Sequence, residues 1–138
     1  MTRQQAGSAS ARGGMKPAKI LIADDSALFR RSLRSFLEQN PKVSVCGEAE
    51  DGRAAIDKFE ELKPDIVILD WQMPVMNGIE AARRIARLAP KAIVALLTLH
   101  SGPQITKQAQ AIGIQHVFSK GDRLERLSDW LTAVCRGE

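Results

Sequence analysis

The segment IVILDWQMPVMNG, residues 66–78, decides the fold of this 138-residue chain. Its first four residues form a continuous apolar run, which is typical of a strand buried on both faces. Asp70 follows the run directly, and Pro74 and the Asn-Gly pair then mark a loop. The loop is followed by apolar residues at helical spacing, namely Ile79, Ala82, Ile85, Ala86 and Ala89. A strand, a loop and a helix in this order indicate one unit of an α/β fold.

The same alternation of strand and helix occurs five times from Lys19 onward. The expected strands are Ile20–Ala23, Val43–Gly47, Ile66–Leu69, Ala92–Leu97 and Ile114–Phe118. The first, third and fourth are continuous apolar runs, whereas the second and fifth contain polar residues and are expected at the sheet edges. The sequence therefore predicts a doubly wound, flavodoxin-like α/β fold. It has five βα units and a parallel sheet of order 2-1-3-4-5 with helices on both faces.

Reactive side chains follow four of the five expected strands. Asp24 and Asp25 follow the first strand, Asp70 the third, Thr98 the fourth and Lys120 the fifth. The carboxyl ends of parallel strands meet at one edge, so we expect these groups to lie together. Three carboxylates repel one another, and a divalent cation that prefers oxygen ligands, Mg²⁺, relieves the repulsion. Such a site suits a phosphoryl group on a carboxylate oxygen, with the cation and Lys120 neutralising the phosphoryl oxygens.

Charge and composition exclude several classes of protein. The length suits one compact domain, and no apolar run approaches the roughly 20 residues of a membrane span. Four of the 20 Lys and Arg residues but none of the 16 Asp and Glu residues lie in residues 1–19. The pI near 9.4 therefore reflects the N-terminal tail, and the balanced remainder predicts no direct binding to nucleic acid. Residues 1–17 lack hydrophobic periodicity, and we expect a disordered tail or leader there.

Four segments resemble the signature segments of bacterial response-regulator receiver domains in two-component systems. They are ILIADDSALFRRSL (20–33), VILDWQMPVMNGIEAARRI (67–85), ALLTLHS (95–101) and VFSKGD (117–122). The resemblance covers Lys19 to about Arg136, so we assign residues 18–138 to a receiver domain. It implies that Asp70 accepts a phosphoryl group from a phosphohistidine on a sensor histidine kinase.

The resemblance also implies a role for each residue of the site. The implied Mg²⁺ ligands are Asp25 and Asp70 directly, Asp24 partly through water, and the main-chain carbonyl of Gln72. The side chains implied to hold the phosphoryl oxygens are those of Thr98 and Lys120. The family further implies a cytoplasmic regulatory domain that is not an enzyme, beyond slow self-dephosphorylation. Phosphorylation would change a protein-interaction surface. One expected consequence in this family is a homodimer that forms on phosphorylation.

The loop segments TLHS and SKGD are most similar to the branch with a LuxR-type helix-turn-helix output domain. We therefore expect control of transcription through a DNA-binding output domain outside this chain. Two positions depart from the family pattern. Gly121 stands where proline is usual, so we expect a trans Lys120–Gly121 bond. Val117 stands where a switch aromatic is usual, and Phe118 should face the other side of the strand.

Three other functions remain open on the sequence alone. A phosphohydrolase of the haloacid-dehalogenase kind would carry its nucleophile in a DxDx[TV] motif after the first strand, where this chain has Asp24-Asp25. A flavodoxin would place a hydroxyl-rich phosphate loop at the same position, where Asp24-Asp25 would instead repel phosphate. The third is a degenerate receiver that acts as a protein-interaction module without phosphate, and Val117 keeps this alternative open.

Overall fold

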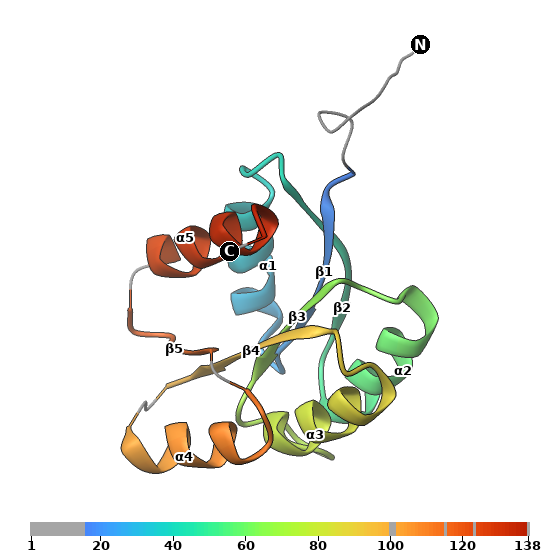
Figure 1. Ribbon diagram of the computed structural model, residues 1–138, viewed down its shortest axis with the longest axis vertical. Helices are drawn as coiled ribbons and strands as arrows, with labels where there is room; N and C mark the ends of the chain where they lie inside the picture. Colours follow the sequence, from blue (N-terminus) through green and yellow to red (C-terminus); the bar gives the residue numbers. More distant parts are fainter. Residues whose placement is uncertain (1–15, 100–101, 115, 123, 138) are drawn as a thin grey trace.

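The computed structural model describes residues 16–99, 102–114, 116–122 and 124–137. In chain order the elements in these residues (Figure 1) are β1 Ala18–Ala23, α1 Ala27–Leu37, β2 Val43–Ala49, α2 Gly52–Leu62, β3 Ile66–Asp70, α3 Gly78–Leu88, β4 Ile93–Thr98, α4 Pro103–Ala111, β5 His116–Ser119 and α5 Leu124–Cys135. The strands form one parallel sheet of order β2-β1-β3-β4-β5, which confirms the predicted fold. The predicted disordered tail, residues 1–17, lies almost wholly outside the described residues.

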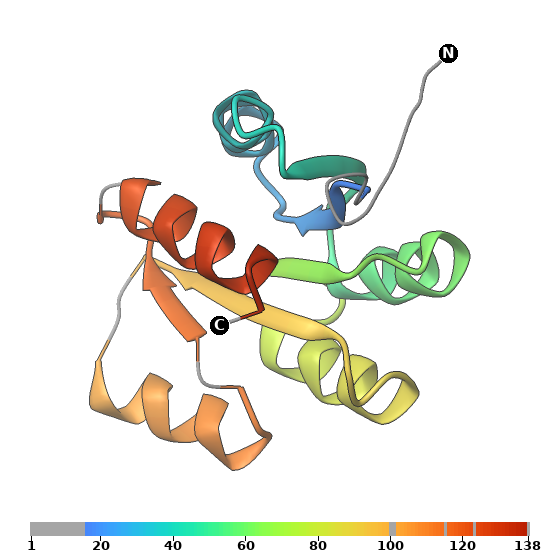
Figure 2. The same cartoon turned by 45° about the horizontal axis from the view of Figure 1, so that its top comes forward.

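The sheet separates two apolar layers of side chains. Figure 2 shows the helices that lie on the two faces of the strands. Helices α1 and α5 cover one face, where Leu33, Leu37, Leu127 and Leu131 are buried. Helices α2, α3 and α4 cover the other face. Successive strand residues alternate between the layers, so Val117 packs with the α2–α3–α4 layer and Phe118 with the α1–α5 layer. The predicted opposite orientation of these two side chains is confirmed.

Strand burial follows the predicted order, with β1, β3 and β4 in the centre and β2 and β5 at the edges. Strands β3 and β4 each extend one residue further than predicted, to Asp70 and Thr98. Strand β5 begins at His116, two residues later than predicted. The reason is that the Ile114 N–H donates to the Ala109 carbonyl, which closes the end of α4 before the strand begins.

Side-chain caps fix where three helices start at the carboxyl edge of the sheet. The side chains of Ser26, Asp51 and Asn77 accept hydrogen bonds from main-chain N–H groups in the first turns of α1, α2 and α3. Helix α4 begins at Pro103 without a side-chain cap, and Ala109 is its one buried residue. The contacts that hold α4 to the sheet are therefore few compared with those of α2 and α3.

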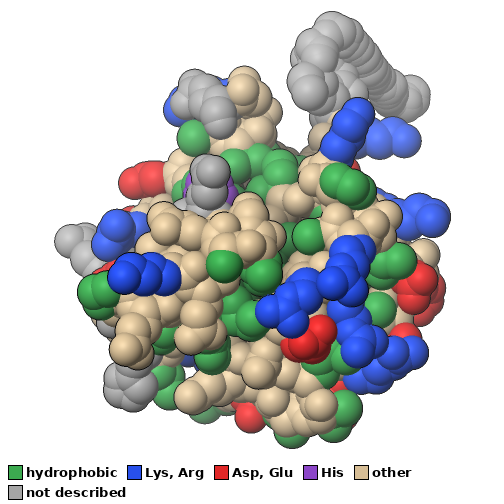
Figure 3. Space-filling model, turned by 60° about the horizontal axis from the view of Figure 1, so that its bottom comes forward, with side chains coloured by type: hydrophobic (Ala, Val, Ile, Leu, Met, Phe, Trp, Pro, Cys, Tyr) green, Lys and Arg blue, Asp and Glu red, His purple; other side chains and the backbone are tan. Residues whose placement is uncertain are grey.

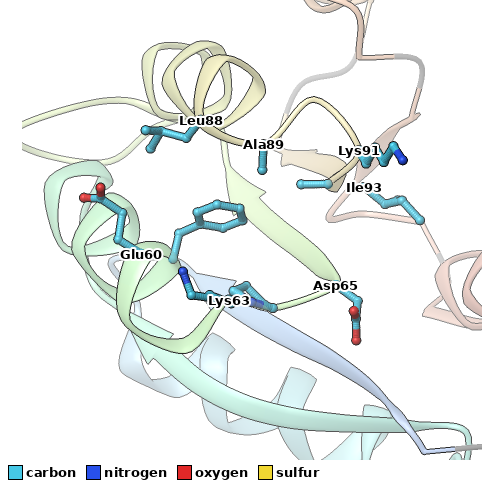
Figure 4. A pocket seen from close by; sticks show the side chains of 10 residues that line it. Glu60, Lys63, Asp65, Leu88, Ala89, Lys91 and Ile93 are labelled. Atoms are coloured by element: carbon cyan, nitrogen blue, oxygen red, sulfur yellow. The ribbon is translucent and has the colours of Figure 1, made fainter.

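A large hollow lies at the amino edge of the sheet, opposite the ends that carry the predicted site. It is formed where α2 and α3 end, and Figure 4 shows Lys63 and Lys91 near its rim and Leu88 above it. On the face seen in Figure 3, the largest group of Lys and Arg side chains has Asp and Glu side chains close by, and smaller groups of Lys and Arg lie elsewhere on the face. Within the described ranges, every helix is too short or too polar to cross a membrane.

Candidate functional site

Three carboxylates meet at the carboxyl ends of β1 and β3. Asp24 and Asp25 follow β1, Asp70 ends β3, and one oxygen from each lies within 4.8 Å of the others. Asp24 and Asp70 are buried, with 1% and 5% of their surface exposed, whereas Asp25 is exposed. The neighbouring strands β1 and β3 bring these residues together, because parallel pairing aligns their carboxyl ends.

Lys120 contributes a positive charge to this cluster from the loop after β5. Its Nζ lies 2.6 Å from Asp24 Oδ2 and 3.4 Å from Asp70 Oδ2. The ammonium also lies over the Phe29 ring, 4.3 Å from the ring centroid, and its main-chain N–H donates to the Thr98 carbonyl. The Lys120–Gly121 peptide bond is trans, as predicted.

The Asp70 carboxyl has a raised pKa. Burial is the largest cause and the charge of Asp24 the second, and together they raise the pKa from 3.8 to about 6. Lys120 and the main-chain N–H of Gln72 act in the opposite direction and lower it. The protein thus holds an ionised Asp70 at neutral pH at a cost in free energy, which one Lys only partly offsets.

Thr98 lies on the strand that pairs with β3, and Gln72 follows Asp70 in the loop after β3. Thr98 is the last residue of β4, is 4% exposed, and follows Leu97, which pairs with Asp70 across the sheet. Gln72 is exposed and lines an open hollow that Asp25 also lines. The structure therefore places all six predicted site residues at the carboxyl edge of the sheet, and the roles assigned to them stay predictions.

The loop after Asp70 depends on two glycines whose roles the sequence did not reveal. A Cβ on Gly78 would lie 2.2 Å from the Asp70 carbonyl oxygen, and one on Gly52 would lie 2.1 Å from the Met76 carbonyl oxygen. The Gly52 N–H donates to that Met76 oxygen over 2.9 Å. Both positions need glycine because the main chain of the loop lies directly against them. The Asn-Gly signal marked the loop but gave no information on this contact.

Glu48, near the end of β2, is a further residue that the sequence did not single out. It forms ion pairs with Arg30 and Arg34 of α1, over 2.9 and 2.8 Å. Their contacts with Glu48 fix α1 against the edge strand beside the site. The available sequence signal was an acidic residue near the carboxyl end of the edge strand β2, beside the strand that leads to Asp24.

The carboxylate cluster fits a divalent cation. Asp24 Oδ2 is buried and makes no hydrogen bond with the described residues, although it lies beside the Lys120 ammonium. Oxygen donors at this spacing match the preference of Mg²⁺, which keeps several waters and binds few protein carboxylates. Asp25, Asp70 and Asp24 are the residues that would hold it.

Comparison with known proteins gives consistent matches. The family model "Response regulator receiver domain" matches residues 20–132. A protein-glutamate methylesterase/protein-glutamine glutaminase of Geobacillus kaustophilus is 42% identical over 107 residues, 77% of this chain and 31% of that protein. A LuxR-family response regulator from Aurantimonas sp. SI85-9A1 has a TM-score of 0.83 and 30% identity, over 88% of this chain and 87% of that one. The response regulator domain of Thermotoga maritima CheB has a TM-score of 0.76 and 31% identity, over 88% and 95%.

The chain spans about a quarter to a third of the length of the curated relatives it matches. Those relatives are methylesterases, so they do not support the transcriptional output predicted from TLHS and SKGD. The reason is that these short loops lie in the receiver itself, whereas the output lies in parts of the relatives that this chain does not match. The match over residues 20–132 and the shared fold show that the chain belongs to the response regulator receiver domain family of two-component systems.

Proposed function

We propose that this domain is a phosphoacceptor whose Asp70 receives a phosphoryl group from a sensor histidine kinase. The observation that carries the proposal is the buried Asp70 carboxylate beside Asp24 and Lys120, with a pKa raised to about 6. At pH 7 roughly nine-tenths of such a group is ionised and able to act as a nucleophile. The cluster has an excess of negative charge, which suits a cation and the phosphoryl group that it stabilises.

The transfer is a substitution at phosphorus. An Asp70 oxygen forms a bond to phosphorus while the bond from phosphorus to the kinase imidazole breaks, and the imidazole keeps the electron pair and takes a proton from solvent. Mg²⁺, when bound, supplies positive charge to the phosphoryl oxygens. Lys120, whose Nζ lies 3.4 Å from Asp70 Oδ2, adds a second positive charge beside the phosphoryl group. The Thr98 hydroxyl donates a hydrogen bond to a phosphoryl oxygen. The proposed Mg²⁺ ligands are Asp25, Asp70, Asp24 and the Gln72 carbonyl.

The output of the switch is a change in protein contacts, in a cytoplasmic two-component system. The methylesterase names of the sequence relatives favour a methylesterase partner domain over a DNA-binding one. We propose that phosphorylation acts through the loop after Thr98 and α4, because that helix has one buried residue and no side-chain cap. Val117 stands at the position of the usual switch aromatic, and its short, β-branched side chain cannot make the movement of an aromatic ring.

Labelling with a small phosphodonor tests the proposal. The protein is incubated with phosphoramidate, with Mg²⁺ or with EDTA, and examined by intact mass and peptide mapping. One acid-stable, base-labile phosphate on Asp70 in the presence of Mg²⁺ is expected, and none in Asp70→Asn. A folded protein that takes no label with Mg²⁺ would refute the proposal and favour the phosphate-independent interaction module. Continuous release of phosphate from varied monoesters would instead indicate a phosphohydrolase.

A further inference from the structure

The main-chain carbonyl of Asp24 accepts a hydrogen bond from a side chain. The Asp24 N–H donates to Ala49 at the end of β2, which completes the strand pairing on that side. The carbonyl lies beyond the end of β1, and Nη1 of Arg30 donates to it. Arg30 lies in the first turns of α1, where side chains point back toward the helix N-terminus and so toward this carbonyl.

That carbonyl belongs to the peptide unit that joins Asp24 to Asp25. The peptide unit is planar, so a hydrogen bond to its oxygen fixes the plane from which both carboxylates extend. Asp24 has further restraints, because its Oδ1 accepts from the Ser26 N–H and its Oδ2 lies 2.6 Å from Lys120. Asp25 is exposed, and the peptide plane that Arg30 holds is one restraint on the direction in which its side chain leaves the main chain.

Arg30 is itself held in place from the edge strand. Its Nε donates to Glu48 Oε1 over 2.9 Å, while the other Glu48 oxygen accepts from Arg34 over 2.8 Å. The Arg30 side chain is 15% exposed, so this pair is better shielded from solvent than most surface ion pairs. The guanidinium fork thus bridges the ends of β1 and β2, a geometry that a lysine cannot reproduce.

Glu48 also compensates the charge of Arg30. A guanidinium without this partner would lie close to the carboxylates of Asp24 and Asp25 and would compete with a cation for them. The two arginines hold the pKa of Glu48 below its usual range, so it stays ionised at neutral pH. Arg30 therefore supplies its hydrogen bond to the site while its charge is largely cancelled.

We propose that Arg30 is a positioning residue for the divalent cation at the phosphoacceptor site. It sets the direction of the Asp24–Asp25 peptide unit and so the approach of the Asp25 carboxylate to the cation, with Glu48 holding it in place. This inference rests on the proposed function, and it concerns cation affinity rather than the transfer itself. Arg30 touches none of the reacting atoms.

The test compares three variants by titration of tryptophan fluorescence with Mg²⁺, since Trp71 directly follows Asp70. Arg30→Met removes the hydrogen bond, and we expect its Kd for Mg²⁺ to rise about tenfold, a typical effect of removing a group that orients a ligand. Arg30→Lys keeps one donor, and we expect an intermediate rise of about threefold. Arg31→Met removes the same charge from an exposed neighbouring position and should leave Kd within about twofold of wild type.

A second readout separates positioning from a general loss of structure. At saturating Mg²⁺ the phosphoramidate labelling rate of Arg30→Met should return to within about twofold of the wild-type rate, and its circular dichroism should match wild type. Equal Kd values for Arg30→Met and Arg31→Met would overturn the inference. If Arg30→Met does not fold, a wild-type Kd for Arg30→Lys overturns it as well. A wild-type protein that binds no Mg²⁺ refutes the proposed function, which is a separate result.

Discussion

Replacing Asp70 by Asn should stabilise the metal-free protein at neutral pH. The pKa of Asp70 is about 6 in the folded protein and near 3.8 in the unfolded chain, so the folded state binds the proton more tightly. Stability therefore falls as pH rises between these values, and the loss is complete above pH 6 to 7. At 1.36 kcal/mol per pKa unit, the ionised carboxylate costs up to about 3 kcal/mol. This figure already includes the favourable 3.4 Å contact between Asp70 and Lys120, which the Asp70→Asn variant loses.

Urea unfolding in EDTA, followed by circular dichroism at several pH values, measures this effect. We expect Asp70→Asn to raise the free energy of unfolding by about 2–3 kcal/mol at pH 7.5 and by about 1 kcal/mol at pH 4.5. Saturating Mg²⁺ should narrow the difference at pH 7.5, because the cation stabilises the wild-type carboxylate. Asp57→Asn, at an exposed carboxylate 3.6 Å from Arg53, is the matched control and should change stability by less than about 0.5 kcal/mol. The reasoning would be refuted if Asp70→Asn did not raise the free energy of unfolding, or raised it equally at pH 7.5 and pH 4.5.

Four further outcomes follow from the loops and the metal cluster. Gly78→Ala should lose about 3 kcal/mol in urea unfolding, because its Cβ would lie 2.2 Å from the Asp70 carbonyl oxygen; a loss below about 1 kcal/mol would contradict the contact. Val75→Asn should gain about 1 kcal/mol, since Val75 has a φ of 68° and is 82% exposed; an unchanged midpoint would show that this backbone is unstrained. Mg²⁺ should raise the melting temperature of wild type but not of Asp25→Asn, and equal shifts would exclude Asp25 as a ligand. Beryllofluoride with Mg²⁺ should change amide hydrogen exchange in α4, and a change confined to β5 would indicate that Val117 carries the response.

The fold was predictable because burial alone ordered the strands. Strands buried on both faces are apolar throughout, so β1, β3 and β4 differed from β2 and β5 in composition. The positions of Asp70 and Lys120 then followed from topology, because each directly follows or ends a strand of the parallel sheet. No tertiary contact had to be known in advance for either residue.

The Arg30–Glu48 contact could not be predicted in this way. The pairing of β1 with β2 shifts between Ile20 and Leu21, so that Ile20 pairs with Val45 and Leu21 with Gly47. This bulge determines where Glu48 lies relative to α1. Gly47 beside it is the available sequence signal, because an isolated glycine within a strand often marks a bulge, but it does not reveal which residues Glu48 contacts. The contacts of Gly52 and Gly78 were hidden for a similar reason. Each of these two contacts depends on the path of the main chain of the loop after β3, which the sequence pattern does not specify.

The bulge in β2 also bears on how this sheet avoids pairing with other copies of itself. An edge strand exposes unpaired N–H and C=O groups that a second chain can use to extend the sheet. The extra residue in β2, Cys46, interrupts the even spacing of those groups and twists the strand locally. At the opposite edge, β5 has only four residues, too few to offer a long template. Both edges are thereby poor sites for intermolecular β-pairing, which protects a highly apolar central sheet against aggregation.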